Sequence, residues 1–173
     1  MKNKPKIALP VILLLLLLPT SSLAGEFIVT RVYDGDSILV TRDRKDTRKV
    51  SLAGIDAPEA SGKKYEQGQP YSQQSKKYLT SLVLNRTVTI ITYDLDVYNR
   101  ASGVVIWEGI NINLEMVRSG LAEVYRGNFP KGMDIEPYLE AEKQAKAAMR
   151  GMWSLGDRYI SPKEWRSMQR EKR

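Results

Sequence analysis

Five short segments with the composition and alternation typical of β-strands constrain the fold of this chain most strongly. Three of them precede the first helical pattern and two follow it, and turn-forming residues separate them. The expected strands span residues 27–32, 37–41, 50–55, 87–93 and 103–107. Because the helical patterns are segregated from these strands, we expect an α+β fold built around a small barrel.

Three further segments place apolar side chains at the 3.6-residue spacing of an amphipathic helix. Asn113 and Asp134 are the expected N-caps of the second and third of these helices, and Gly120 and Gly151 end them. The expected helices span residues 70–85, 113–120 and 134–151. The whole chain has 173 residues and shows no internal linker, so it should form a single domain.

The first 24 residues have the pattern of an export signal. Three lysines precede an apolar run over residues 7–18, and small residues follow up to Ala24. The run is shorter than the roughly 20 residues that a membrane-spanning helix needs. We therefore expect cleavage after Ala24 and export to the periplasm or the medium, with an uncleaved N-terminal anchor as the alternative. The chain has no cysteine, so the exported domain must be stable without disulfides.

The formal net charge of +7 is unevenly distributed. Residues 25–157, the expected domain, contain as many basic as acidic side chains, and the surplus lies in the signal and in the tail over residues 158–173. A general positive field is therefore no argument for a nucleic-acid partner. The basic tail could be an arm that binds phosphate or a solvated end, and we expect the solvated end.

Three carboxylates stand at expected strand ends, where binding groups tend to collect. Asp36 closes the turn over residues 34–36, and Asp56 and Glu59 belong to a turn-rich stretch over residues 54–59. Carboxylates suit a hard divalent cation such as Ca²⁺ or Mg²⁺, and the chain has no His or Cys for a softer metal. Each piece alone could be an ordinary turn or strand end, but together with Arg100 they favour a functional site.

Five motifs resemble, in order and spacing, those of the staphylococcal nuclease family. They lie at residues 33–37, 54–59, 96–100, 117–122 and 151–153. The resemblance implies an OB-fold, which is a five-stranded barrel, with three helices. It also implies a calcium ion on the carboxylates of Asp36 and Asp56 and on the carbonyl of Ala57. Members of this family cut DNA and RNA and leave 3′-phosphates.

The same resemblance assigns the catalytic roles. Glu59 matches the carboxylate that activates or orients the attacking water, and Arg100 matches one of two arginines that clamp the phosphate. The chemistry is reasonable, because a cation and a guanidinium both stabilise the charge that develops on the phosphate oxygens. A general base beside them would activate the water.

One position departs from the family pattern. The second clamping arginine of the family stands five residues before Asp56, where this chain has Ser51. A serine hydroxyl donates one hydrogen bond but brings no charge. Lys49 lies on the same face of the expected strand, roughly 6.6 Å away, and its long side chain could supply the charge. Arg48 should point to the other face.

Three functional hypotheses remain open from the sequence. The first is an exported, monomeric, Ca²⁺-dependent nuclease that acts on DNA or RNA and is slowed by Ser51. The second is an OB-fold module that binds nucleic acid or another phosphate ligand without cleaving it. The third is an extracytoplasmic interaction domain that only inherits the fold.

Overall fold

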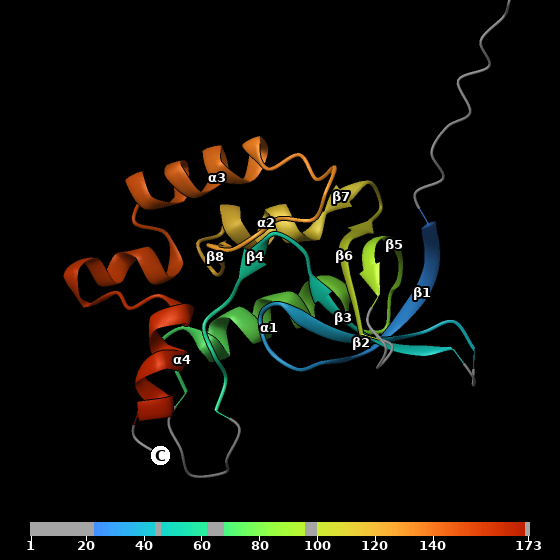
Figure 1. Ribbon diagram of the computed structural model, residues 1–173, viewed down its shortest axis with the longest axis horizontal. Coiled ribbons are helices and arrows are strands. Elements are labelled where there is room, and N and C mark those ends of the chain that lie inside the picture. The colour runs from blue at the N-terminus through green and yellow to red at the C-terminus, as the bar shows by residue number, and fades with distance from the viewer. Residues whose placement is uncertain (1–22, 44–45, 62–67, 96–99, 172–173) are drawn as a thin grey trace, which may run out of the picture.

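The computed structural model describes residues 23–43, 46–61, 68–95 and 100–171. Figure 1 shows a small barrel with helices packed around it, which confirms the expected α+β class. Among these residues, no helix is long and apolar enough to cross a membrane.

Five strands form the barrel, and all five were expected. They are β1 (Leu23–Val32), β2 (Ser37–Thr41), β3 (Thr47–Leu52), β5 (Thr87–Leu95) and β6 (Arg100–Trp107). Neighbours in the order β3-β2-β1-β5-β6 are antiparallel, and a parallel pairing of β3 with β6 closes the barrel. The interior is filled mainly by fully buried β-branched residues, including Val29, Ile38, Val40, Val50, Val88, Ile90 and Val105. Each such side chain contributes roughly 1.5–3 kcal/mol on burial.

Strand β1 begins two residues before the expected cleavage point. Leu23 pairs with Thr92 and Ala24 pairs with Ile91, on the neighbouring strand β5. Removal of residues 1–24 would therefore leave the barrel with a first strand that starts at Gly25.

The third expected strand is interrupted. A turn at residues 53–54 separates β3 from the two-residue strand β4 (Ile55–Asp56). Gly54 has a φ of 79°, a conformation that favours glycine, and this turns the chain out of the barrel wall. Strand β4 then pairs with β8 (Glu123–Val124), while β7 (Ile110–Asn111) pairs antiparallel with the end of β6.

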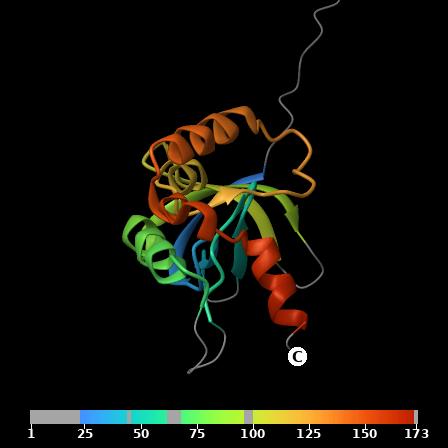
Figure 2. The same ribbon diagram turned by 90° about the vertical axis from the view of Figure 1, so that its left-hand side faces the viewer.

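The three expected helices occur in the expected order, and two helical elements, η1 and α4, follow them. They are α1 (Ser72–Val83), α2 (Ile112–Arg118), α3 (Glu136–Ala147), the 3₁₀ segment η1 (Gly151–Arg158) and α4 (Pro162–Glu171). Figures 1 and 2 show α2 and α3 side by side on one side of the barrel. Helix α4 stands apart from this pair.

The expected helix caps are wrong. Asn111, not Asn113, caps α2 by accepting a hydrogen bond from the Leu114 N–H at 3.0 Å. Asn113 lies inside the helix and is fully buried, and its amide group bonds to Ala53 O and to backbone groups of β6. The N-cap position of α3 is Ile135, one residue after Asp134, although Asp134 Oδ1 accepts a hydrogen bond from the Glu136 N–H at 3.2 Å. In α2 the tertiary contacts of the buried asparagine outweigh the local capping preference.

Candidate active site

The loop between β1 and β2 brings two aspartates to one end of the barrel. Asp34 Oδ1 accepts hydrogen bonds from the Asp36 N–H at 3.1 Å and from Ser37 Oγ at 2.8 Å, which fixes a tight turn. A Cβ on Gly35 would overlap Ser75 Oγ, so only glycine lets this loop lie against α1. The turn therefore holds Asp36 in a defined position.

The three expected metal ligands come together at this loop. The Ala57 N–H donates to Asp36 Oδ2 at 2.8 Å, across 21 residues of sequence, and Asp56 directly precedes Ala57. Burial raises the pKa of Asp36 well above its ordinary value, and the carboxylates of Asp34 and Asp56 raise it further. The site thus concentrates negative charge that a bound cation would neutralise.

The donor set fits a hard cation. Two carboxylates and a backbone carbonyl are the oxygen ligands that Ca²⁺ prefers, and they come from Asp36, Asp56 and Ala57. Within the described ranges, no three acidic side chains form a metal site by themselves. The expected set needs only two carboxylates, and in this structure both oxygens of one of them, Asp56, accept hydrogen bonds from Arg166.

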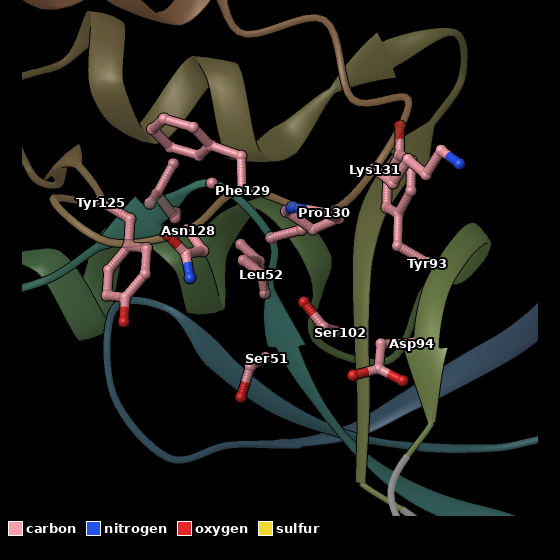
Figure 3. A pocket seen from close by; sticks show the side chains of 13 residues that line it. Ser51, Leu52, Tyr93, Asp94, Ser102, Tyr125, Asn128, Phe129, Pro130 and Lys131 are labelled. Carbon is pink, nitrogen blue, oxygen red and sulfur yellow. The ribbon is translucent and has the colours of Figure 1, made fainter.

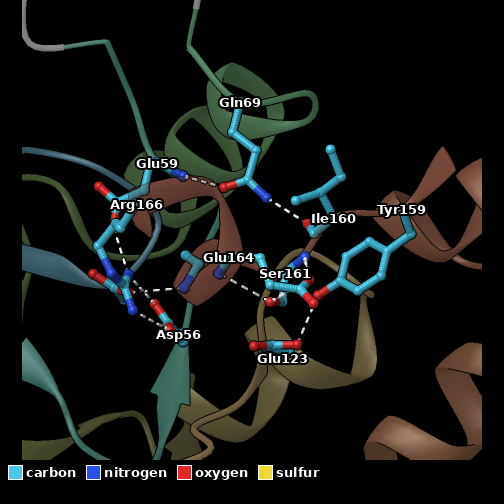
Figure 4. A network of polar contacts seen from close by, with 11 residues as sticks. Asp56, Glu59, Gln69, Glu123, Tyr159, Ile160, Ser161, Glu164 and Arg166 are labelled. Carbon is cyan, nitrogen blue, oxygen red and sulfur yellow. Dashed lines mark hydrogen bonds and ion pairs between the residues drawn. The ribbon is translucent and has the colours of Figure 1, made fainter. Parts of the chain in front are cut away.

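A guanidinium from the tail binds Asp56 and Glu59 (Figure 4). Arg166 Nη1 donates to Asp56 Oδ1 at 2.9 Å and to Glu59 Oε1 at 2.6 Å, and its Nη2 donates to Asp56 Oδ2 at 2.8 Å. The hydrogen bonds to Asp56 raise the pKa of Arg166 above its ordinary value. The expectation of a solvated tail is therefore wrong for this residue, because α4 carries it into the carboxylate cluster.

Helix α4 begins with a capping box. Ser161 Oγ accepts a hydrogen bond from the Glu164 N–H at 3.2 Å, and Glu164 Oε2 accepts one from the Ser161 N–H at 3.0 Å. Pro162 occupies the first helical position, where its missing N–H costs little. These three residues fix where the helix starts, and hence which side chain faces Asp56.

Two partly buried contacts hold the segment that leads into α4. Gln69 donates from Nε2 to Ile160 O at 2.7 Å, while its Oε1 accepts from the Glu59 N–H at 3.0 Å. Tyr159 donates from its hydroxyl to Glu123 Oε2 at 2.6 Å, and Glu123 pairs with Asp56 across the β4–β8 ladder. One anchor of α4 therefore reaches the backbone N–H of Glu59, and the other reaches the side chain of the residue that pairs with Asp56 (Figure 4).

The remaining expected residues lie along β3 and β6. Ser51 is exposed on β3 and pairs with Ser102 of β6. Lys49 is on the same exposed face, but its Nζ lies over the Tyr33 ring, 4.8 Å from the centroid. Arg100 starts β6 opposite Lys49 in the backbone register, and the position of its side chain lies outside the described residues.

A cleft of about 500 Å³ extends from Ser51 along this end of the barrel (Figure 3). Gly54 and Ile55, which directly precede Asp56, form part of its wall. Tyr125 and Phe129 also line it and are 40% and 37% exposed, and the cation of Lys131 borders it. The cleft therefore combines aromatic faces with one cation, Lys131, and one carboxylate, Asp94.

Sequence reasoning missed Arg166 and Gln69. Net charge drew attention to the tail as a whole, whereas the capping box over residues 161–164 was the local signal for a helix there. That signal predicts α4. It does not predict the role of Arg166, which is identified only by the contact with Asp56 in the structure. No comparable signal marks Gln69, because its two partners are backbone groups far apart in sequence.

Comparisons with known proteins identify the family of this chain. Residues 49–155 match the family described as staphylococcal nuclease homologue. An uncharacterized endonuclease of Haemophilus influenzae is 36% identical over 82% of this chain and 73% of its own length. An uncharacterized endonuclease of Escherichia coli O157:H7 is 37% identical over 80% of this chain and 82% of its own, and a probable endonuclease of Clavispora lusitaniae is 37% identical over 78% and 69%. The family-matched segment contains β4, the cleft and the predicted residues Ser51, Asp56, Ala57, Glu59 and Arg100, and the chain belongs to the staphylococcal nuclease family.

Proposed function

We propose that this protein is an exported endonuclease that hydrolyses phosphodiester bonds of DNA or RNA and depends on Ca²⁺. One observation carries the proposal: Asp36, Asp56 and Glu59 lie together at the end of the barrel, in a chain of a nuclease family. Export is supported by the signal pattern over residues 1–24.

Asp36, Asp56 and the carbonyl of Ala57 would hold the cation. When bound, Ca²⁺ would supply positive charge next to the phosphate oxygens. The chain itself provides the general base. Arg166 holds Glu59 Oε1, so Oε2 is the oxygen that can accept a proton from a water as the water attacks phosphorus. The P–O5′ bond then breaks, the sugar oxygen takes up a proton from solvent, and a 3′-phosphate remains.

The cleft would accommodate the nucleic-acid strand. Tyr125 and Phe129 offer exposed rings on which bases can stack, and Lys131 can pair with a phosphate. Stacking is tolerant of sequence, because every base has a flat face. The proposed enzyme therefore prefers single-stranded or locally open substrates over closed duplexes.

Ser51 supports a second candidate function. The family's arginine at this position is absent, and a site without that charge could bind a phosphate ligand without turning it over. Such a module would shift denatured DNA in a gel with a strong dependence on salt and would leave it intact.

The test uses denatured DNA with millimolar Ca²⁺, and a matched reaction with EGTA. Cleavage only with Ca²⁺ supports the proposal. In the same assay, Glu59→Gln should lower the turnover number by roughly 10²–10⁴-fold while Ca²⁺ still raises the melting temperature. The exposed Glu140→Gln serves as the control and should match wild type. A salt-sensitive shift without cleavage would favour the binding module, and equal cleavage with EGTA would exclude the calcium dependence.

A further inference from the structure

We propose that Arg166 is a phosphate-binding residue of this active site, supplied by α4 where β3 carries only Ser51. The inference rests on the proposed nuclease function, because the phosphate is that of the substrate. Helix α4 lies beyond residue 155, where the match to the family ends. The inferred role therefore belongs to a part of the chain that the family match does not cover.

The hydrogen-bond geometry leaves Arg166 able to take another acceptor. A guanidinium has five N–H donors. Its three bonds to Asp56 and Glu59 use both hydrogens of Nη1 and one of Nη2. Among the described residues, the Nε–H and the second Nη2 hydrogen have no hydrogen-bond acceptor, so they can donate to a phosphate oxygen. The side chain is 36% exposed, so a ligand can reach it.

The carboxylates around Arg166 explain why a cation is needed at this position. Asp34, Asp36, Asp56, Glu59 and Glu123 all lie at this end of the barrel, and a phosphate anion that approaches them is repelled. A guanidinium fixed between Asp56 and Glu59 offsets this repulsion next to the general base. Arginine binds phosphate with parallel, charge-assisted hydrogen bonds, which a serine at position 51 cannot provide.

The contacts that anchor α4 indicate that this helix does not leave the active site when a substrate binds. Gln69 and Tyr159 tie the entry of the helix to the backbone beside Glu59 and to Glu123, and both contacts are short. Pro162 is buried, and the capping box fixes the first turn. A helix held in this way is a permanent wall of the site, so Arg166 acts on each substrate that binds.

The experiment compares Arg166→Gln, Arg166→Lys and the control Arg170→Gln, which removes an exposed arginine one turn later on the same helix. The first measurement is kcat and KM for cleavage of single-stranded DNA with Ca²⁺. We expect Arg166→Gln to lower kcat/KM by roughly 10²–10³-fold, and Arg166→Lys to recover part of this loss because it keeps a charge. Arg170→Gln should stay close to wild type.

The second measurement is independent of cleavage. It is the Kd of thymidine 3′-monophosphate in the presence of Ca²⁺, determined by calorimetry. Arg166→Gln should raise this Kd by roughly tenfold or more, whereas Arg170→Gln should not. A retained Ca²⁺-dependent rise in melting temperature shows that each variant is folded and that its cation site is intact, and Arg166→Lys provides the comparison if the Gln variant fails this check.

Several outcomes would overturn the inference. Faster cleavage or tighter nucleotide binding by Arg166→Gln would mean that Arg166 blocks the site. Values equal to those of Arg170→Gln, or a folded Lys variant no better than the Gln variant, would equally exclude a phosphate contact. If wild type fails to cleave DNA while the Kd still rises in Arg166→Gln, the nuclease assignment fails and the phosphate contact stands.

Discussion

Two clusters of carboxylates flank the β4–β8 ladder, and their charge is balanced in opposite ways. On the β8 side, Glu142 accepts hydrogen bonds from Arg126 at 2.7 Å, Lys146 at 2.9 Å and the Val124 N–H at 2.8 Å. Burial alone would raise the pKa of Glu142, but these three donors outweigh it and lower the pKa. On the β4 side, burial and neighbouring carboxylates raise the pKa of Asp36.

The difference separates a structural ion pair from a binding site. The Glu142 cluster has donors for each oxygen and joins β8 to α3, so it stabilises the fold without any ligand. In the β4 cluster Arg166 pairs with Asp56 and Glu59, whereas no cation pairs with Asp36 among the described residues. The charge of Asp36 therefore costs stability in the free protein and favours cation binding. A carboxylate whose burial is not compensated within the protein is thus the better indicator of a ligand.

The largest expected effect comes from removing a carboxylate of the β4 cluster. Asp36→Ala or Asp56→Ala should abolish the rise in melting temperature with millimolar Ca²⁺, because a ligand stabilises only the state that binds it. Cleavage should fall by roughly a thousandfold or more. Glu142→Ala is the matched control from the other cluster, and it should lower the melting temperature but keep the response to Ca²⁺. A wild-type melting temperature that does not change with Ca²⁺ would refute the assignment of these carboxylates as metal ligands.

An intermediate effect is expected on stability without Ca²⁺. Glu142→Gln should destabilise the protein by about 1–3 kcal/mol in urea unfolding at neutral pH, since two cations lose their ionised partner. The folded-state pKa of Glu142 lies below the unfolded value of 4.5, so this contribution is present above that pH and is lost as the pH falls through the folded pKa. The Gln variant should accordingly show a flatter decline in stability below pH 4.5.

In the same urea measurement, Asp36→Asn should change the free energy of unfolding in the opposite direction. Because the folded pKa of Asp36 is raised, ionisation of this carboxyl opposes folding at neutral pH, and the amide can still accept the bond from Ala57. The variant should be at least as stable as wild type in EGTA. A clear loss of stability in EGTA would mean that the two clusters do not differ as described.

The smallest expected effect is that of Ser51→Arg. If Arg166 already provides the second guanidinium, a new arginine on β3 should change kcat by only about threefold in the wild-type background. In the Arg166→Gln background the same change should recover a larger share of the lost rate. Lys49→Ala should have little effect in either background, since its ammonium lies over Tyr33. A large gain in kcat from Ser51→Arg in wild type would show instead that the substrate phosphate lacks a second cationic partner in the native site.

The parts of the fold that depend on local signals were predictable from the sequence. Alternating β-branched residues identified all five barrel strands, and the turn-rich stretches placed Asp36, Asp56 and Glu59 at strand ends. The capping role of Asn113 was predicted wrongly, because a local preference does not show that Ala53 and Gly103 lie within reach of its amide. The role of Arg166 could not be predicted for the same reason, since its partners lie more than a hundred residues away.

That separation in sequence also bears on the order in which the protein folds. Arg166 meets Asp56 and Glu59 across 110 and 107 residues, and Gln69 meets Ile160 across 91. Contacts that close such long loops form late, after the local strands and helices exist. The active site is therefore expected to be completed after the barrel, and a partly folded chain can show native secondary structure while it remains inactive. Recovery of cleavage during refolding should consequently lag behind recovery of the far-ultraviolet circular dichroism signal.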